Sequence, residues 1–189
     1  TEREDRVQLA EDLQGKLTLQ ATGEGETFYF LQSEGIPANN KVEELDENLS
    51  IRRTYYTRFG NPATEIKQGD LVVCELALTG GDQSAENILI SDLIPAGFEI
   101  DNPRLNPSAD LNWIKERQGR FTPQYLDVRD DRLLVFTDVR AKQTKRFFYL
   151  LRAVSSGKFV LPAVGAEAMY DPTYRSYNGA GILEIKPMQ

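Results

Sequence analysis

Short apolar or alternating segments recur along this chain, and residues typical of turns separate them. The segments are rich in Val, Ile, Leu, Phe, Tyr and Thr, which favour the pleated, half-buried surface of a β-sheet. Gly, Pro, Asn and Asp lie between them, as expected of tight connections. We predict strands at residues 16–21, 27–31, 50–56, 71–78, 88–93, 124–128, 133–139, 145–154, 157–161, 164–169 and 182–186. Their number and spacing predict an antiparallel β-sandwich.

The alternation is clearest at residues 71–78, LVVCELAL. One face of this predicted strand is fully apolar, and the other is mostly apolar, so we expect partial cover on the second face as well. Helix signals are scarce. One helical turn or two are predicted at residues 110–116, with Asp110 as the N-cap.

The absence of histidine excludes several kinds of enzyme. With 0 His and 1 Cys in 189 residues, the chain has no Ser-His or Cys-His pair, no imidazole base and no Cys/His zinc site. The one thiol, Cys74, is a possible nucleophile, but with nothing to activate it we interpret it as a buried core residue. We therefore expect no enzyme activity and no cofactor.

The charge balance argues against two kinds of partner. A formal net charge of −7 without a basic run disfavours nucleic acid and anionic lipid. No apolar run approaches the ~20 residues of a membrane span. The first residues, TEREDRV, lack the basic and apolar pattern of a secretion leader, as expected of mature protein or of a fragment.

Two groups of carboxylates are candidate sites. Asp127, Asp130 and Asp131 have the oxygen ligands that calcium prefers, but arginines interleave with them, so we predict a charged hairpin turn and no metal site. Asp92, Glu99 and Asp101 form a second group, and paired carboxylates can hydrolyse glycosides. We interpret these three as charges in loops and at strand ends.

A stretch near the end of the chain is rich in residues that make adaptable contacts. Residues 167–181 place Met169, Tyr170, Tyr174 and Tyr177 in a segment with loop-like composition. Met and Tyr provide a large contact area, and loops often carry function. An ordinary Tyr-rich loop that closes a sandwich is the alternative, and both interpretations stay open.

Several segments together resemble a known family. They are ISDLIPAGFEI at 90–100, IRRTYY at 51–56, VRDDR at 128–132, FYLLRA at 148–153 and PAVGAEAMYDP at 162–172. Their order and spacing resemble the C-terminal region of bacterial alpha-2-macroglobulins over about residues 13–186.

The resemblance implies a fold for each part of the chain. Residues 48–189 are expected to form the terminal macroglobulin-like β-sandwich, which has an immunoglobulin-like architecture. Residues 1–47 are expected to supply the last strands of a split CUB-type β domain, followed by the acidic linker NNKVEELDEN at 39–48. Two strands in about 40 residues are too few for an independent domain, which agrees with a domain completed elsewhere in a parent chain.

The resemblance also implies a function. The family traps proteases of broad range in the periplasm as bacterial defence, and the parent is expected to be an inner-membrane lipoprotein. The terminal sandwich packs on the thioester domain, and Met169 and Tyr170 match the residues that shield the thioester until the bait region is cut. Tyr174 and Tyr177 are candidate additional interface residues. A thioester of the parent would lie outside this chain, since Cys74 is followed by Glu75-Leu76-Ala77 rather than by a Cys-x-x-Gln pattern. In branches of the family that lack the thioester, Met169 and Tyr170 would be simple interface residues.

Two rival hypotheses belong to other classes. The first is an immunoglobulin-like adhesion or spacer module of a cell-surface protein, which would need no preformed contact at residues 169–177. The second is a carboxylate glycosidase or sugar-binding module, which would need a cleft with facing carboxylates.

Overall fold

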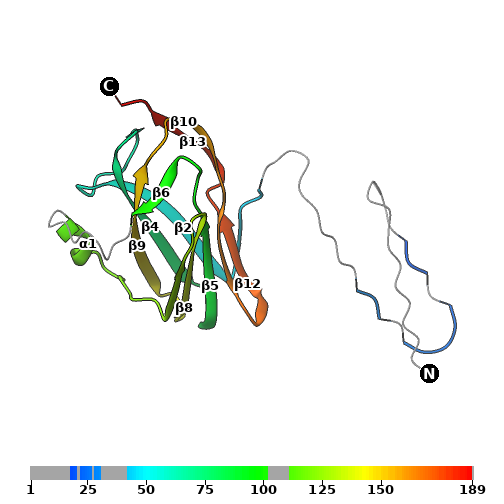
Figure 1. Ribbon diagram of the computed structural model, residues 1–189. Coiled ribbons are helices and arrows are strands. Elements are labelled where there is room, and N and C mark those ends of the chain that lie inside the picture. Colours follow the sequence, from blue (N-terminus) through cyan, green and yellow to red (C-terminus); the bar gives the residue numbers. More distant parts are fainter. Residues whose placement is uncertain (1–17, 21, 27, 31–41, 102–110, 189) are drawn as a thin grey trace. The chain divides into compact units, whose positions relative to one another are not determined.

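The computed structural model describes residues 18–20, 22–26, 28–30, 42–101 and 111–188 (Figure 1). The chain divides into two units, Thr1–Ile36 and Pro37–Gln189. All strands of the described residues lie in the second unit. Among the described residues, no helix has the length and hydrophobicity of a membrane span.

The described part of the second unit consists of strands and one short helix. The strands are β1 (Leu45–Glu47), β2 (Leu49–Thr57), β3 (Ile66–Lys67), β4 (Leu71–Gly80), β5 (Ala85–Leu93), β6 (Phe98–Asp101), β7 (Tyr125–Val128), β8 (Arg132–Val139), β9 (Thr144–Ala153), β10 (Gly157–Leu161), β11 (Val164–Ala168), β12 (Asp171–Asn178) and β13 (Gly181–Lys186). The helix is α1 (Asn112–Glu116).

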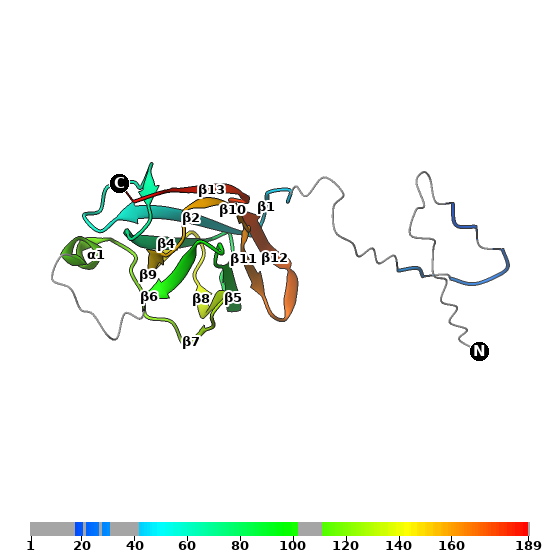
Figure 2. The ribbon, with the colours of Figure 1, turned by 45° about the horizontal axis from the view of Figure 1, so that its top comes forward.

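The strands form three sheets (Figures 1 and 2). A six-stranded sheet has the order β1-β12-β11-β5-β8-β7, and a four-stranded sheet has the order β2-β4-β9-β6. A small sheet, β10-β13-β3, contains the parallel pair β13–β3, and the other strand pairs are antiparallel. Side chains from the two larger sheets meet in one apolar core, which confirms the predicted antiparallel β-sandwich.

The central strand β4 is covered on both faces, as its sequence predicted. Leu76 and Leu78 lie in the core between the sheets, and Val73 on the opposite face is also inaccessible to solvent. Trp113 of α1 contributes to the outer cover, since its ring lies 5.4 Å from that of Tyr56 on β2 and 6.0 Å from that of Phe148 on β9. These two strands flank β4, so the helix packs over the outer face of the four-stranded sheet.

Four strands were missing from the sequence prediction: β1, β3, β6 and β12. The largest difference is β12, because residues 171–178 were predicted as loop and instead pair with β11 along one edge. β1 lies within the predicted acidic linker and pairs with β12 on the other edge. Strand pairing with distant partners therefore overrides the loop-like composition of both segments.

The two predicted N-terminal strands and the predicted N-cap of α1 fall partly outside the described residues. Residues 18–20 and 28–30 of the two predicted N-terminal strands are not in strands, and the rest of those segments lie outside the described residues. A strand needs a hydrogen-bonding neighbour, and the described residues provide none for these two segments. Leu111 occupies the N-cap of α1 without a side-chain hydrogen bond. The predicted N-cap residue, Asp110, lies outside the described residues.

Candidate functional site

The candidate site is the hairpin formed by β11 and β12, with Met169 and Tyr170 in its turn. Ala168 of β11 pairs with Asp171 of β12, so Met169 and Tyr170 alone connect the two strands. Met169 is 51% exposed and Tyr170 is 81% exposed. We call this pair the hairpin tip. Figure 2 shows β11 and β12 side by side, joined by the orange turn that carries the tip.

The backbone around the tip is held by specific hydrogen bonds. The Met169 N–H donates to the Asn87 carbonyl on β5 at 3.0 Å. Beyond the turn, the Asp171 carboxylate accepts from the Thr173 N–H at 3.0 Å and from its hydroxyl at 2.6 Å. These bonds lower the pKa of Asp171, and they form the local turn that Asp commonly makes. The apolar pair is therefore displayed on an ordered backbone.

The two remaining predicted interface residues lie away from the turn, on β12. Tyr174 is half-buried and packs against the core. Tyr177 faces the other side of the strand and covers Gly165, where an added Cβ would lie 3.2 Å from its ring. Its hydroxyl donates to the Glu167 carboxylate at 3.2 Å, and burial, followed by Glu167, raises the pKa of Tyr177. A role for these tyrosines in an interface stays a prediction.

Arg53 on β2 holds the base of the hairpin. Its Nη2 donates to the carbonyls of Pro162 at 2.5 Å and Gly179 at 3.1 Å, which lie just before β11 and just after β12. Its Nη1 donates to Asp92 on β5 at 2.5 Å. The Arg53 side chain is 2% exposed and that of Asp92 is 0% exposed. One buried guanidinium therefore connects both ends of the hairpin to the core.

Asp92 also joins two residues from the opposite sheet. The Tyr149 hydroxyl donates to Asp92 Oδ2 at 2.6 Å, and Cys74 Sγ lies 3.9 Å from the same oxygen. Burial raises the pKa of the Cys74 thiol well above its usual value, and the Asp92 charge raises it further. Cys74 is thus a buried thiol without nucleophilic character, which confirms its prediction as a core residue.

The carboxylates predicted as loop and strand-end charges have three different settings. Asp92 lies within β5 and is fully buried, which corrects that interpretation. Glu99 and Asp101 both lie in β6, where Asp101 pairs with Arg152 at 2.8 Å. The periodicity of β5 carried a signal for Asp92, since Ile88, Ile90 and Asp92 alternate onto one inward face.

The Asp-rich segment forms the predicted charged hairpin turn between β7 and β8. Asp127 pairs with Arg129 at 2.9 Å, and Asp131 pairs with Arg132 at 2.6 Å. Within residues 18–30, 42–101 and 111–188, as far as they are described, no cluster of three or more His, Cys, Asp or Glu side chains could hold a metal ion.

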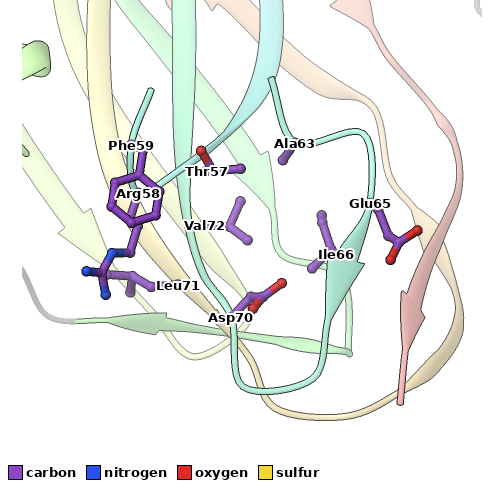
Figure 3. Close-up of a pocket in the computed structure, with 9 residues that line it drawn as sticks. All are labelled: Thr57, Arg58, Phe59, Ala63, Glu65, Ile66, Asp70, Leu71 and Val72. Atoms are coloured by element: carbon purple, nitrogen blue, oxygen red, sulfur yellow. The ribbon is translucent and has the colours of Figure 1, made fainter. Parts of the chain in front are cut away.

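A small pocket of about 210 Å³ lies near the end of β2 and the start of β4. Figure 3 shows Ala63, Ile66 and Val72 pointing toward one another across it. The Thr57 hydroxyl, which also belongs to the lining, has no hydrogen-bond partner. The pocket shares no residue with the hairpin.

Comparison with known proteins places the sequence in a family. Residues 49–173 match the family described as the Bacterial Alpha-2-macroglobulin MG10 domain. The alpha-2-macroglobulin of Escherichia coli is 30% identical over 191 residues, covering 90% of this chain and 11% of that protein. The Pasteurella multocida protein is 28% identical over 164 residues, covering 84% of this chain and 8% of that protein. The chain thus spans about a tenth of the length of these relatives.

Solved structures agree with this placement. Trypsin-activated alpha-2-macroglobulin from Escherichia coli has a TM-score of 0.68 and 26% identity, covering 76% of this chain and 11% of that one. Salmonella alpha-2-macroglobulin reacted with methylamine has a TM-score of 0.67 and 29% identity, covering 77% of this chain and 10% of that one. The chain therefore belongs to the bacterial alpha-2-macroglobulin family, and residues 49–173 are its MG10 domain.

Proposed function

We propose that this chain is a non-catalytic docking module of a bacterial alpha-2-macroglobulin that traps proteases of broad range. Its hairpin tip packs on the neighbouring thioester domain of the parent and shields the thioester from water. Cleavage of the bait region by a protease then separates the two domains and exposes the reactive bond.

One observation carries this proposal: two large side chains, Met169 and Tyr170, are exposed at a turn whose backbone is fixed. An exposed Met and Tyr contribute little to the fold of their own domain, but they provide a large contact area for a partner. A reactive acyl bond survives when apolar groups exclude water, and it reacts when the cover moves away.

The descriptions of two relatives support the proposed shielding of a thioester. The Escherichia coli relative is described as activated by trypsin, and the Salmonella relative as reacted with methylamine. An amine that reacts with the protein fits an electrophilic bond, and activation by a protease fits release of a cover. We also propose that the parent is periplasmic and anchored to the inner membrane as a lipoprotein, as the resemblance to the family implies.

The test is the double substitution Met169→Ala/Tyr170→Ala in the full-length protein. We expect free thiol to appear several-fold faster in water, because the thioester loses its cover, while stability changes by less than ~0.5 kcal/mol because both side chains are exposed. Thiol titration over time measures the release, and buried Cys74 adds no fast background in the folded protein.

The matched control replaces an exposed apolar pair elsewhere on the module. Val160 on β10 and Ile182 on β13 pair across the small sheet and are 70% and 68% exposed. Val160→Ala/Ile182→Ala should leave the release rate unchanged. Equal rates for the wild type and the Met169/Tyr170 variant would contradict shielding by the tip.

A further inference from the structure

The hairpin tip rests on an unusual residue of β5. Asn87 has a φ of 54°, in the left-handed region, and lies in the irregular segment where the β5–β8 register shifts between Ala85 and Ile88. Asn tolerates this conformation better than most residues with a side chain. The shift turns the Asn87 carbonyl to the Met169 N–H, at 3.0 Å.

A carboxylate on the next strand fixes Asn87 in turn. Asp138 on β8 accepts the Asn87 N–H through Oδ1 at 2.8 Å. Its second oxygen accepts from Gln124 Nε2 at 2.5 Å. Both carboxylate oxygens are therefore occupied, and hydrogen bonds from backbone N–H groups to a charged acceptor are stronger than neutral ones. Asp138 on β8 therefore fixes the left-handed conformation of Asn87. β8 and the hairpin lie on opposite sides of β5.

We infer that Asp138 is a positioning residue for the hairpin tip and that it acts through the backbone of Asn87. The connection has two steps: Asp138 fixes the N–H of Asn87, and the carbonyl of Asn87 fixes the N–H of Met169. It follows the sheet order β8-β5-β11, so neighbouring strands carry it directly. The functional consequence rests on the proposed shielding role, since a turn that moves covers its partner less completely.

Four single substitutions in the full-length protein test the connection. Asp138→Ala removes the acceptor, whereas Asp138→Asn keeps Oδ1 as an acceptor. Asn87→Val disfavours the left-handed conformation, whereas Asn87→Gly adopts it without strain. Each disruptive change thus has a matched conservative change at the same position, and both positions, 87 and 138, lie outside the apolar core.

The primary readout is hydrogen exchange of the Met169 amide, measured by mass spectrometry on peptides that span residues 164–178. We expect Asp138→Ala and Asn87→Val to speed this exchange on the order of tenfold, as expected for loss of one anchoring hydrogen bond. Asp138→Asn and Asn87→Gly should stay near the wild type. Peptides from β4 should be unchanged in all four, which separates local loosening from global destabilisation.

Two results on exchange would overturn the inference. The first is an unchanged Met169 amide in Asp138→Ala, and the second is an equally fast exchange in Asp138→Asn and Asp138→Ala. Thiol release in the same variants separates this inference from the proposed function. If Met169→Ala/Tyr170→Ala speeds release but a loosened Asp138→Ala does not, positioning is refuted and shielding stands. If the double variant leaves release unchanged, shielding fails, and the exchange data alone decide the anchoring.

Discussion

At the scale of single residues, the buried pair Arg53–Asp92 fixes the position of the β11–β12 hairpin. Burial raises the pKa of Asp92, and Arg53 and then Tyr149 oppose the shift. When a carboxyl has a higher pKa in the folded state, the unfolded chain releases the proton first. Stability therefore falls as the pH rises from the usual pKa of the carboxyl through its raised pKa. The pair instead specifies where the β11–β12 hairpin begins and ends.

We expect Arg53→Met to destabilise the protein by about 3–5 kcal/mol, because it leaves the Asp92 carboxylate buried without its partner. Asp92→Asn should also destabilise, since Arg53 loses its counter-charge. The double variant Arg53→Met/Asp92→Asn should lose less than the sum of the two single losses, because no unpaired charge remains. Urea unfolding of all four proteins measures this coupling.

Arg53→Lys is the conservative control for that cycle. Lys keeps the charge but lacks the planar fork that reaches Asp92 and two carbonyls at once. We expect an intermediate loss of stability. Additive single effects would show that Arg53 and Asp92 act independently, contrary to the geometry.

The sequence identified some residues of the site and missed others for a physical reason. Cys74 was correctly predicted as core, because a strand of strong alternation contains it. Met169 and Tyr170 came from a family resemblance, and the structure adds that they share an exposed turn. Asp138 and Asn87 were missed because their roles depend on hydrogen bonds between strands, which no local pattern encodes.

At the scale of elements, the edge strand β1 is held to its neighbours mainly by polar contacts. Asp46 accepts from Arg52 at 2.9 and 2.5 Å and from the Ser176 hydroxyl at 2.7 Å. Glu47 pairs with Arg175 on β12 at 2.8 Å. Charged residues on an edge strand also discourage pairing with another chain. The acidic sequence that resembled a solvated linker is therefore an edge strand with specific partners.

The pKa of Asp46 predicts a pH dependence for this edge. The hydrogen bond from Arg52 is the main cause that lowers the pKa of Asp46 from its usual 3.8. A carboxyl with a lowered pKa contributes stability that is fully present above pH 3.8 and is lost as the pH falls through the lowered value. Asp46→Asn should therefore be less stable than the wild type at pH 7, and the difference should shrink below the usual pKa.

Urea unfolding at a series of pH values checks this expectation. Arg52→Gln is the matched variant, because it removes the main cause of the shift while keeping Asp46. It should show the same convergence with the wild type at low pH. A stability difference that is constant with pH would show that the Asp46 carboxylate makes no contribution through its charge.

Most strands with apolar alternation were predictable, including β4, β5, β8 and β9, since their burial dictates their pattern. The missing strands share a different property. β12 reads DPTYRSYN and β1 reads LDE, and both contain residues that strands disfavour: Asp, Pro and Asn in β12, and Asp and Glu in β1. They form because β11 and β12 supply the pairing edges, so their conformation depends on contacts distant in sequence.

At the scale of the whole molecule, the described core identifies which part of the chain carries its own hydrophobic interior. Every buried member of the core cluster lies between Leu49 and Ile185. β1 lies just before this range and still pairs with β12. The division of the chain at Pro37 includes β1 in the sandwich, whereas the boundary predicted from the sequence, at residues 47 and 48, excludes it. That predicted boundary, and the CUB-type assignment of residues 1–47, stay predictions.

Two shortened chains distinguish these boundaries. A chain of residues 37–189 keeps β1 and the whole described core, so we expect its free energy of unfolding to lie within ~0.5 kcal/mol of that of the 189-residue chain. A chain of residues 48–189 loses the pairing of β1 with β12 and the contacts of Asp46 and Glu47, which should cost about 1–2 kcal/mol. Urea unfolding of both measures the difference, and equal stabilities would place the boundary after residue 47. A large loss in both would mean that residues 1–36 contribute to the stability of the sandwich, which its described core gives no reason to expect.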